Sequence, residues 1–170
     1  MVKTVTEDTV REALRAVMDP EIPTCSITDL GVVHDVRITS EKIEIDLLPT
    51  FAGCPALDVI REDVEAAIRK LTSDADLRVR FVNDPPWTTD RISVGGREAL
   101  GAYGITPPVL LGIGRKEART CPYCGSEQTI EESAFGPTPC RTVHYCSSCR
   151  NPFEGFKTKT ASPPQDAAAS

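Results

Sequence analysis

The sequence predicts an α+β fold with a small mixed three-stranded sheet, followed by a small cysteine-rich β module of the zinc-ribbon kind. Two observations support this prediction. Helical and strand-like periodicities alternate over residues 6–103, and two Cys-x-x-Cys pairs lie close together near the C-terminus. We expect the elements of the first part in the order α-β-β-α-β-α.

The first half of that order is predicted from a helix cap, from prolines that end a helix, and from alternating apolar residues. A helix is expected to begin after Thr6, which can cap it, and to continue until Asp19-Pro20 stops it. Prolines, hydroxyls and a glycine predict a structured loop or short turn over 21–31. Alternating apolar residues over 33–38 and 43–48 then predict two strands of a hairpin.

The second half contains a crossover. Apolar residues at helical spacing from Leu57 to Leu71 predict a helix, and alternation over 77–81 predicts a third strand. A strand that returns through a helix should lie parallel to one of the first two strands. Trp87 is expected to anchor its loop on the core, and a weaker helix is expected over 90–103 despite Gly95-Gly96.

A chain of 170 residues with 40% hydrophobic content is long enough for one ordinary domain and a small appendage. We expect an α+β domain over 1–106, a connector over 107–118, the ribbon-like module over 119–157 and a disordered tail over 158–170. The tail consists mainly of small and polar residues, which cannot bury enough apolar surface to order it.

The composition narrows the class of protein. A net charge of −6 disfavours nucleic acid as a partner, because the phosphate backbone would repel the chain on average. The sequence lacks a long apolar stretch and a signal-peptide pattern, so we expect no membrane partner and a cytoplasmic location. Seven cysteines in that reducing compartment indicate metal binding or thiol chemistry instead of disulfides.

The paired cysteine motifs predict a metal site. Each Cys-x-x-Cys turn directs two sulfur atoms at one ion, and two such turns complete the tetrahedral thiolate shell that zinc favours. We therefore expect one zinc ion per chain, although the ligand types alone also allow iron. Thiol–disulfide catalysis is the competing interpretation of these motifs. The preferred ligands are Cys121, Cys124, Cys146 and Cys149.

Cys140 and His144 lie between the two motifs and complicate this assignment. Either residue could replace one of the four sulfur ligands or help to hold an iron–sulfur cluster. We rank Cys140 as the fifth candidate and interpret His144 as a surface or packing residue. A shell with four protein ligands leaves no open position for substrate, so the module is expected to be structural or to dock a partner.

Cys54 stands apart from the cluster, in Gly53-Cys54-Pro55 just before a strongly periodic helix. A thiol at a helix N-terminus is close to unpaired amide donors, which favour the reactive thiolate. Burial as a small apolar residue is the alternative for Cys54 and the preferred interpretation of Cys25. Three nearby carboxylates could orient a ligand, but capping of turns is the preferred interpretation. They are Asp19, Glu21 and Asp29.

Several motifs resemble a known family. The segments 19–23, 26–33 and 53–56 are similar to the small iron–sulfur assembly domain of SufT-type proteins and of cytosolic iron–sulfur targeting factors. Together with 85–90, 103–108 and the two Cys-x-x-Cys pairs, they resemble the D-subunit family of bacterial phenylacetyl-CoA epoxidases. The resemblance covers residues 6–157.

The resemblance implies an accessory factor that helps to mature an iron–sulfur or di-iron centre, and that is not itself the oxygenase or another enzyme. It implies protein partners among the oxygenase and reductase subunits, with a homo-oligomer left open, and transient handling of iron or an iron–sulfur cluster. An adaptor that only bridges metalloenzyme components is the alternative. Cys54 matches the loop cysteine of the family and Cys140 another family cysteine, while the further motif positions are Asp19, Glu21, Asp29 and Thr50.

Overall fold

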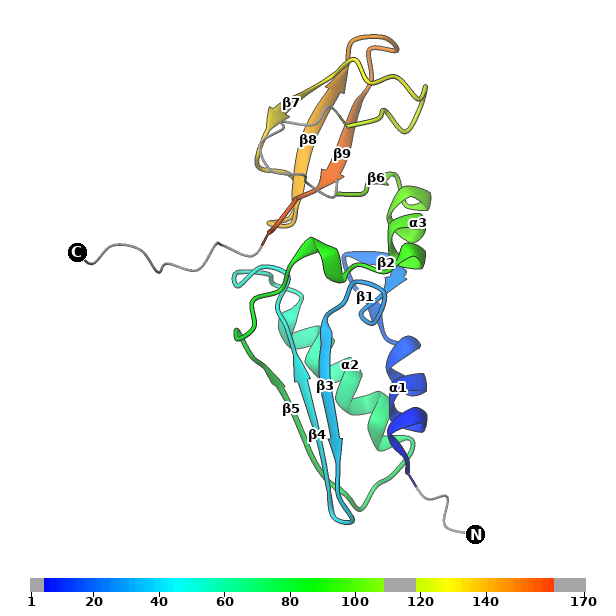
Figure 1. Ribbon diagram of the computed structural model, residues 1–170, viewed down its shortest axis with the longest axis vertical. Coiled ribbons are helices and arrows are strands. Elements are labelled where there is room, and N and C mark those ends of the chain that lie inside the picture. The colour runs from blue at the N-terminus through cyan, green and yellow to red at the C-terminus, as the bar shows by residue number, and fades with distance from the viewer. Residues whose placement is uncertain (1–4, 109–118, 161–170) are drawn as a thin grey trace, which may run out of the picture.

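The computed structural model describes residues 5–108 and 119–160. It contains an α+β domain and, C-terminal to that domain, a β module, as Figure 1 shows. The predicted fold class is confirmed. The α+β domain, called the N-terminal domain below, contains α1 (Glu7–Arg15), β1 (Met18–Asp19), β2 (Ile22–Ser26), β3 (Val33–Ile38), β4 (Lys42–Leu47), α2 (Leu57–Arg69), β5 (Asp76–Phe81), a 3₁₀ turn (Thr89–Arg91) and α3 (Val94–Ala102).

The main sheet of this domain has the strand order β3-β4-β5. β3 and β4 form the predicted antiparallel hairpin, and β5 lies parallel to β4, which confirms the crossover. α1 contacts α2 and β3, while α2 also contacts β5, so the two helices cover one face of the sheet (Figure 1). Their apolar stripes face inward because residues at helical spacing share one side. The buried members are Val10, Leu14, Ile60, Val64 and Ile68.

The segment that precedes the main sheet, from α1 to β2, differs from the prediction. Thr6 caps α1 as expected, since its side chain accepts a hydrogen bond from the amide of Thr9 at 3.3 Å. However, α1 ends at Arg15, before the predicted stop, because Met18 and Asp19 pair with β2 instead. The segment predicted as a loop thus contains most of a small two-stranded antiparallel sheet.

The predicted third helix forms in spite of its glycines. α3 begins after Ser93, whose hydroxyl accepts a hydrogen bond from the amide of Gly96 at 2.9 Å. A Cβ atom at Gly96 would lie 2.5 Å from the carbonyl oxygen of Asp29, whereas one at Gly95 would make only ordinary contacts. Gly96 therefore allows α3 to pack closely on the turn that contains Asp29.

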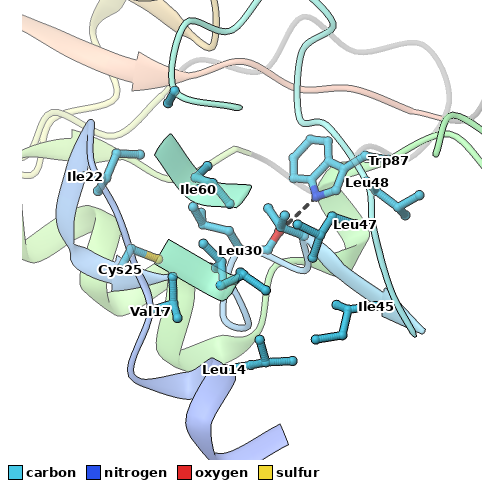
Figure 2. Packing of buried hydrophobic residues seen from close by; sticks show 14 of the residues in the cluster. Leu14, Val17, Ile22, Cys25, Leu30, Ile45, Leu47, Leu48, Ile60 and Trp87 are labelled. Atoms are coloured by element: carbon cyan, nitrogen blue, oxygen red, sulfur yellow. Dashed lines mark hydrogen bonds between the residues drawn. The ribbon is translucent and has the colours of Figure 1, made fainter. Parts of the chain in front are cut away.

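Trp87 anchors its loop on the core, as predicted. Its ring is almost fully buried, and its Nε1 donates a hydrogen bond to the carbonyl of Leu30 at 2.9 Å, the dashed line in Figure 2. The ring centroid lies 6.0 Å from that of Phe156, which belongs to the β module and is 1% exposed. The hydrophobic core of the N-terminal domain therefore continues into the β module.

The β module, called the ribbon below, is a sheet with the strand order β6-β9-β8-β7. β6 pairs parallel to β9, so residues 105–106, which the predicted boundary places in the first domain, join the sheet of the ribbon. Arg119 ties these strands together through carbonyl groups of Thr106, Pro107 and Phe156. The strands are β6 (Ile105–Thr106), β7 (Thr129–Ser133), β8 (Arg141–Cys146) and β9 (Pro152–Phe156).

Parts of the predicted connector and tail, 109–118 and 161–170, lie outside the described residues. Residues 158–160 at the start of that tail are placed, and the carbonyl of Lys159 accepts a hydrogen bond from the amide of Thr89 at 2.9 Å. Within 5–108 and 119–160, no helix has both the length and the apolar character needed to cross a membrane.

Candidate metal centre and thiol site

Four cysteines of the ribbon converge on one point. Their sulfur atoms all lie within 4.8 Å of one another, and the pairs Cys121–Cys149 and Cys124–Cys146 are 3.6 Å apart. A tetrahedral zinc ion with Zn–S bonds of about 2.3 Å holds its sulfur ligands about 3.8 Å apart. The four side chains therefore fit a closed zinc shell, and they form a metal-binding site of the zinc-ribbon kind.

The two turns that carry these cysteines have the same backbone geometry. The amide of Gly125 donates to the carbonyl of Cys121 at 2.9 Å, and the amide of Arg150 donates to the carbonyl of Cys146 at 2.8 Å. Both donors adopt left-handed conformations, with φ of 71° at Gly125 and 59° at Arg150. Glycine adopts this conformation freely, whereas arginine does so at a steric cost.

In the second turn, local hydrogen bonds lower the pKa of the cysteine thiols and so favour the thiolate form that binds metal. The side chain of Asn151 and nearby groups lower the pKa of Cys149 to about 6, and the amide of Cys149 lowers the pKa of Cys146. The amide of Ser126 also lowers the pKa of Cys124, but burial and the neighbouring thiols raise it to about 12. Four thiols this close cannot all ionise unless a cation balances them.

Cys140 and His144 do not join the group of four. Cys140 precedes β8, whereas Cys146 ends it, and six residues of extended strand separate them by roughly 20 Å. His144 stacks on Phe153 at 5.3 Å, and its Nε2 lies 2.7 Å from the hydroxyl of Thr142. Because that hydroxyl donates to the carbonyl of Gly155, His144 donates its Nε2 proton, so this nitrogen cannot coordinate a metal.

Cys54 lies in the loop between β4 and α2 and is half-buried. α2 begins at Leu57, and the carbonyl of Cys54 accepts the hydrogen bond of its amide at 3.4 Å. Burial raises the pKa of the Cys54 thiol, the amide of Ala56 lowers it, and Cys140, Asp19 and Glu21 raise it further. The net direction is upward, so the expected thiolate is not favoured, because desolvation outweighs the amide at the helix terminus.

Asp19 ends β1 and Glu21 lies on the turn that leads to β2, and the charges of both raise the pKa of the Cys54 thiol. One oxygen of Asp19, Oδ1, accepts the amides of Glu21 at 2.8 Å and Ile22 at 3.1 Å, so this carboxylate does cap its turn. Its other oxygen has no hydrogen-bond partner among the described residues. Asp19 is only 8% exposed, and burial raises the pKa of its carboxyl group.

The remaining candidates have structural contacts. Both carboxylate oxygens of Asp29 are occupied, by the hydroxyls of Ser26 at 2.8 Å and Ser93 at 2.7 Å, which fasten the turn to α3. The carbonyl of Thr50 accepts a bond from the ammonium group of Lys159 at 3.3 Å. Cys25 is fully buried, and desolvation raises its pKa to about 12, which agrees with a packing role.

Arg141 is a residue that sequence reasoning missed. It follows Cys140 directly, is 8% exposed, and donates from one guanidinium nitrogen to the carbonyl of Glu21 at 2.5 Å. A second nitrogen pairs with Glu154 at 2.9 Å, and the ring of Tyr103 lies 5.8 Å away. An arginine beside a cysteine was visible in the sequence, but its partners come from distant segments.

Comparisons with known proteins agree with this division of the molecule. A model of the iron–sulfur cluster assembly protein family matches residues 7–81, and a model of the PaaD zinc β-ribbon domain matches residues 106–157. A domain of unknown function from Bacillus anthracis has a similar structure, with a TM-score of 0.52 and 32% identity over 56% of this chain and 91% of that one. A conserved hypothetical protein from Thermotoga maritima has a TM-score of 0.52 and 34% identity over 59% of this chain and 99% of that one.

Two curated relatives cover different shares of the chain. A protein of Escherichia coli K12, named provisionally as the D subunit of 1,2-phenylacetyl-CoA epoxidase, is 41% identical over 150 residues, or 85% of this chain and 88% of that protein. The Fe–S protein maturation auxiliary factor YitW of Bacillus subtilis is 34% identical over 96 residues, or 56% of this chain and 93% of that protein.

The fold and the four-thiolate site define a protein in which an iron–sulfur cluster assembly domain is joined to a zinc-ribbon metal site. Since the similarity to the E. coli protein extends over most of both chains, the chain belongs to the family of phenylacetyl-CoA epoxidase D subunits.

Proposed function

We propose that this protein is an accessory factor that matures a metal centre of a multicomponent phenylacetyl-CoA epoxidase and does not itself catalyse the oxygenation. In this proposal the N-terminal domain handles iron or an iron–sulfur cluster transiently, with Cys54 as the contact to the cargo. Family membership and the relative that is named an Fe–S protein maturation auxiliary factor support the proposal.

The observation that carries the proposal is the surroundings of Cys54. A half-buried thiol, whose pKa is raised in part by the carboxylates of Asp19 and Glu21, lies on the domain that matches the iron–sulfur assembly family. Thiolate and carboxylate are both suitable ligands for iron. Because its pKa is raised, the thiol keeps its proton until a cation replaces it, which suits brief binding better than permanent binding.

We assign one zinc ion per chain to Cys121, Cys124, Cys146 and Cys149. When bound, zinc supplies a structural crosslink, since four protein ligands leave no position for substrate. The ribbon then offers a rigid surface for the oxygenase and reductase subunits, and we propose that this occurs in the cytoplasm. Elemental analysis of the purified protein should give about one zinc and no iron at rest. Iron with acid-labile sulfide in place of zinc would contradict this assignment.

The decisive experiment replaces Cys54 with serine in cells that also produce the epoxidase. We expect the purified oxygenase to contain less iron and to lose activity in proportion, while the level of the variant protein stays unchanged. The matched control is Cys25→Ser, which alters a buried thiol that is hydrogen-bonded to the carbonyl of Gly96 at 3.8 Å. Full iron content of the oxygenase with the Cys54 variant would reject the maturation role.

A structural adaptor is the second candidate. It is favoured by the raised pKa of Cys54, which describes an unreactive thiol at neutral pH, and by exposed aromatic residues on the ribbon. Tyr123 is 63% exposed and Phe135 is 81% exposed, which makes both available to a partner. If the adaptor is correct, Phe135→Ser should abolish co-purification with the oxygenase, while Cys54→Ser should leave the iron content of the oxygenase unchanged.

A further inference from the structure

Two lysine ammonium groups lie over phenylalanine rings where the ribbon joins the N-terminal domain. The ammonium group of Lys157 lies 5.6 Å from the centre of the Phe51 ring and 5.2 Å from the centre of the Phe135 ring. The ammonium group of Lys159 lies 5.6 Å from the centre of the same Phe51 ring. These four side chains therefore form one continuous group, which we call the lysine–phenylalanine cluster.

Contacts with both parts of the molecule hold this cluster in place. After β9 the chain passes from the ribbon to the N-terminal domain (Figure 1). There the carbonyl of Lys159 accepts the amide of Thr89 at 2.9 Å, and its ammonium group donates to the carbonyl of Thr50 at 3.3 Å. On the ribbon, the hydroxyl of Ser133 accepts the amide of Phe135 at 3.0 Å and donates to its carbonyl at 2.9 Å.

The positive charges of the cluster are ordered but not neutralised by carboxylates. None of the ion pairs within 5–108 and 119–160 involves Lys157 or Lys159, whereas Lys42 pairs with Glu44 at 2.8 Å. The face of an aromatic ring attracts an ammonium group without carrying an opposite net charge. Both lysines are half-buried and Phe135 is 81% exposed, so an anion from solution can reach the cluster.

The dimensions and charge of the cluster suit an acidic protein segment. Both ammonium groups lie at the same distance from one ring, so no more than twice that distance separates them. An extended peptide spans such a distance in about three or four residues. Surfaces for anionic membranes gather about four to eight lysines or arginines. The net charge of −6 disfavours a nucleic acid.

We propose that the lysine–phenylalanine cluster is the docking surface for an acidic segment of the client metalloenzyme. Two carboxylates of the segment lie opposite Lys157 and Lys159, and an apolar side chain packs on Phe135. This inference rests on the proposed function, which supplies the client, and adds the surface and the chemistry of the partner. The amide of Cys54 donates to the carbonyl of Phe51 at 3.1 Å, so docking brings the client beside the proposed cargo contact.

The test measures peptide binding by the full-length, zinc-loaded protein. The probe is a fluorescein-labelled, end-capped peptide of two glutamates, leucine, phenylalanine and two further glutamates, and its control has glutamine in place of each glutamate. Fluorescence anisotropy should show about tenfold tighter binding of the acidic peptide, which two partly exposed charge pairs can supply. This preference should shrink between about 50 mM and about 300 mM salt, because salt screens exposed charges.

Substitutions assign the preference to the cluster. Lys157→Gln combined with Lys159→Gln should remove it, whereas arginine at both positions keeps the charges and the ring contacts and should retain it. Phe135→Ser should weaken the binding of both peptides. Lys70→Gln is the matched control, because Lys70 is an exposed lysine at the end of α2 that is farther from the Cys54 loop. Zinc content and circular dichroism of every variant should match those of the parent.

The contrary outcomes are distinct. Equal binding of the two peptides by the parent, or a preference that survives the double glutamine variant, would overturn the docking surface. Tighter binding of an octauridylate RNA or of phosphatidylserine vesicles would overturn it as well, since the cluster would then serve another class of partner.

Cys54→Ser separates this inference from the proposed function. That variant should bind the acidic peptide like the parent while it fails to supply iron to the oxygenase. If the parent shows no peptide preference but Cys54→Ser still lowers the iron content, the docking surface is rejected and the maturation role stands. If the preference holds and the iron content stays full, the maturation role is rejected and the docking surface stands.

Discussion

Asp46 is the buried carboxylate of the main sheet. It lies on β4 between Arg80, whose Nε donates at 2.6 Å, and Arg37, which donates at 2.8 Å. The hydrogen bond from Arg80, followed by that from Arg37, lowers the pKa of Asp46 below its usual value of 3.8, although burial opposes this. A carboxyl group with a lowered pKa in the folded protein stabilises the fold only while it is ionised.

We expect Asp46→Asn to lower the free energy of unfolding by about 1–2 kcal/mol at pH 7, because both arginines are partly exposed and the pairs are screened. The difference from the parent should shrink as the pH falls below the usual aspartate pKa of about 4, because the unfolded chain binds a proton there, whereas folded Asp46, with its lowered pKa, binds one only at lower pH. Urea unfolding between pH 7 and pH 3 measures it. Asp35→Asn, at a half-exposed partner of Arg37, is the control and should change stability by less than about 0.5 kcal/mol.

At the scale of single residues, sequence reasoning succeeded where the cause was local. The cap at Thr6 and the anchoring of Trp87 follow from residue type and neighbours. It did not find the pairing of Asp46 with Arg80, because these residues become partners only once β4 and β5 adopt their register. For the same reason it could not find the hydrogen bond from Arg141 to the carbonyl of Glu21, since that contact depends on how the ribbon packs against the N-terminal domain.

At the scale of elements, α3 offers a matched pair of glycines. A methyl group at Gly96 would meet the backbone of Asp29 at 2.5 Å, whereas at Gly95 the nearest contact would be 3.6 Å. We expect Gly96→Ala to destabilise the protein by about 1–3 kcal/mol, because the new methyl group would clash with backbone atoms, which move less easily than a flexible side chain. Gly95→Ala should stabilise it by about 0.5–1 kcal/mol, because alanine favours the helix. Thermal unfolding of both variants tests this, and equal shifts would contradict the packing of α3 on the Asp29 turn.

The two Cys-x-x-Cys turns of the ribbon form another matched pair, since they share backbone geometry but not sequence. Arg150→Gly should stabilise the zinc-loaded ribbon by about 1 kcal/mol, because it relieves the left-handed conformation at φ of 59°. Gly125→Ala should destabilise the zinc-loaded ribbon by a similar amount, because it places a side chain on a left-handed residue with φ of 71°. Competition for zinc with a chromogenic chelator measures both changes. Tighter zinc binding in Gly125→Ala would be the contrary result.

Helices and strands with strong periodicity were predicted well, and the failures at this scale have physical causes. α1 ends early because the backbone at Met18 and Asp19 pairs with a strand, and β2 is too rich in proline and hydroxyls to show alternation. β6 has only two residues and carries no pattern. It becomes a strand because β9 lies beside it.

At the scale of the whole molecule, Phe156 links the ribbon to the N-terminal core through Trp87. Phe156→Ala should lower the free energy of unfolding by about 3–5 kcal/mol. Fluorescence of Trp87, the single tryptophan of the chain, should report this loss within the N-terminal domain. Phe153, also on β9 but packed in the cluster of Cys121 and Cys146, provides the control. Phe153→Ala should weaken zinc retention and shift the Trp87 transition less than Phe156→Ala does. Equal shifts would mean that the two cores are not distinct.

The position of β9 has a consequence for synthesis of the protein. This strand lies between β6 and β8, yet it is made after both, so the sheet cannot close until the last described strand has left the ribosome. Until then Trp87 lacks its partner Phe156, and the hydrophobic core of the N-terminal domain lacks one of its buried side chains. A nascent chain can fold its three-stranded sheet early, but it completes its hydrophobic core only at the end. Incomplete chains would therefore leave the side of the Trp87 ring that faces Phe156 uncovered.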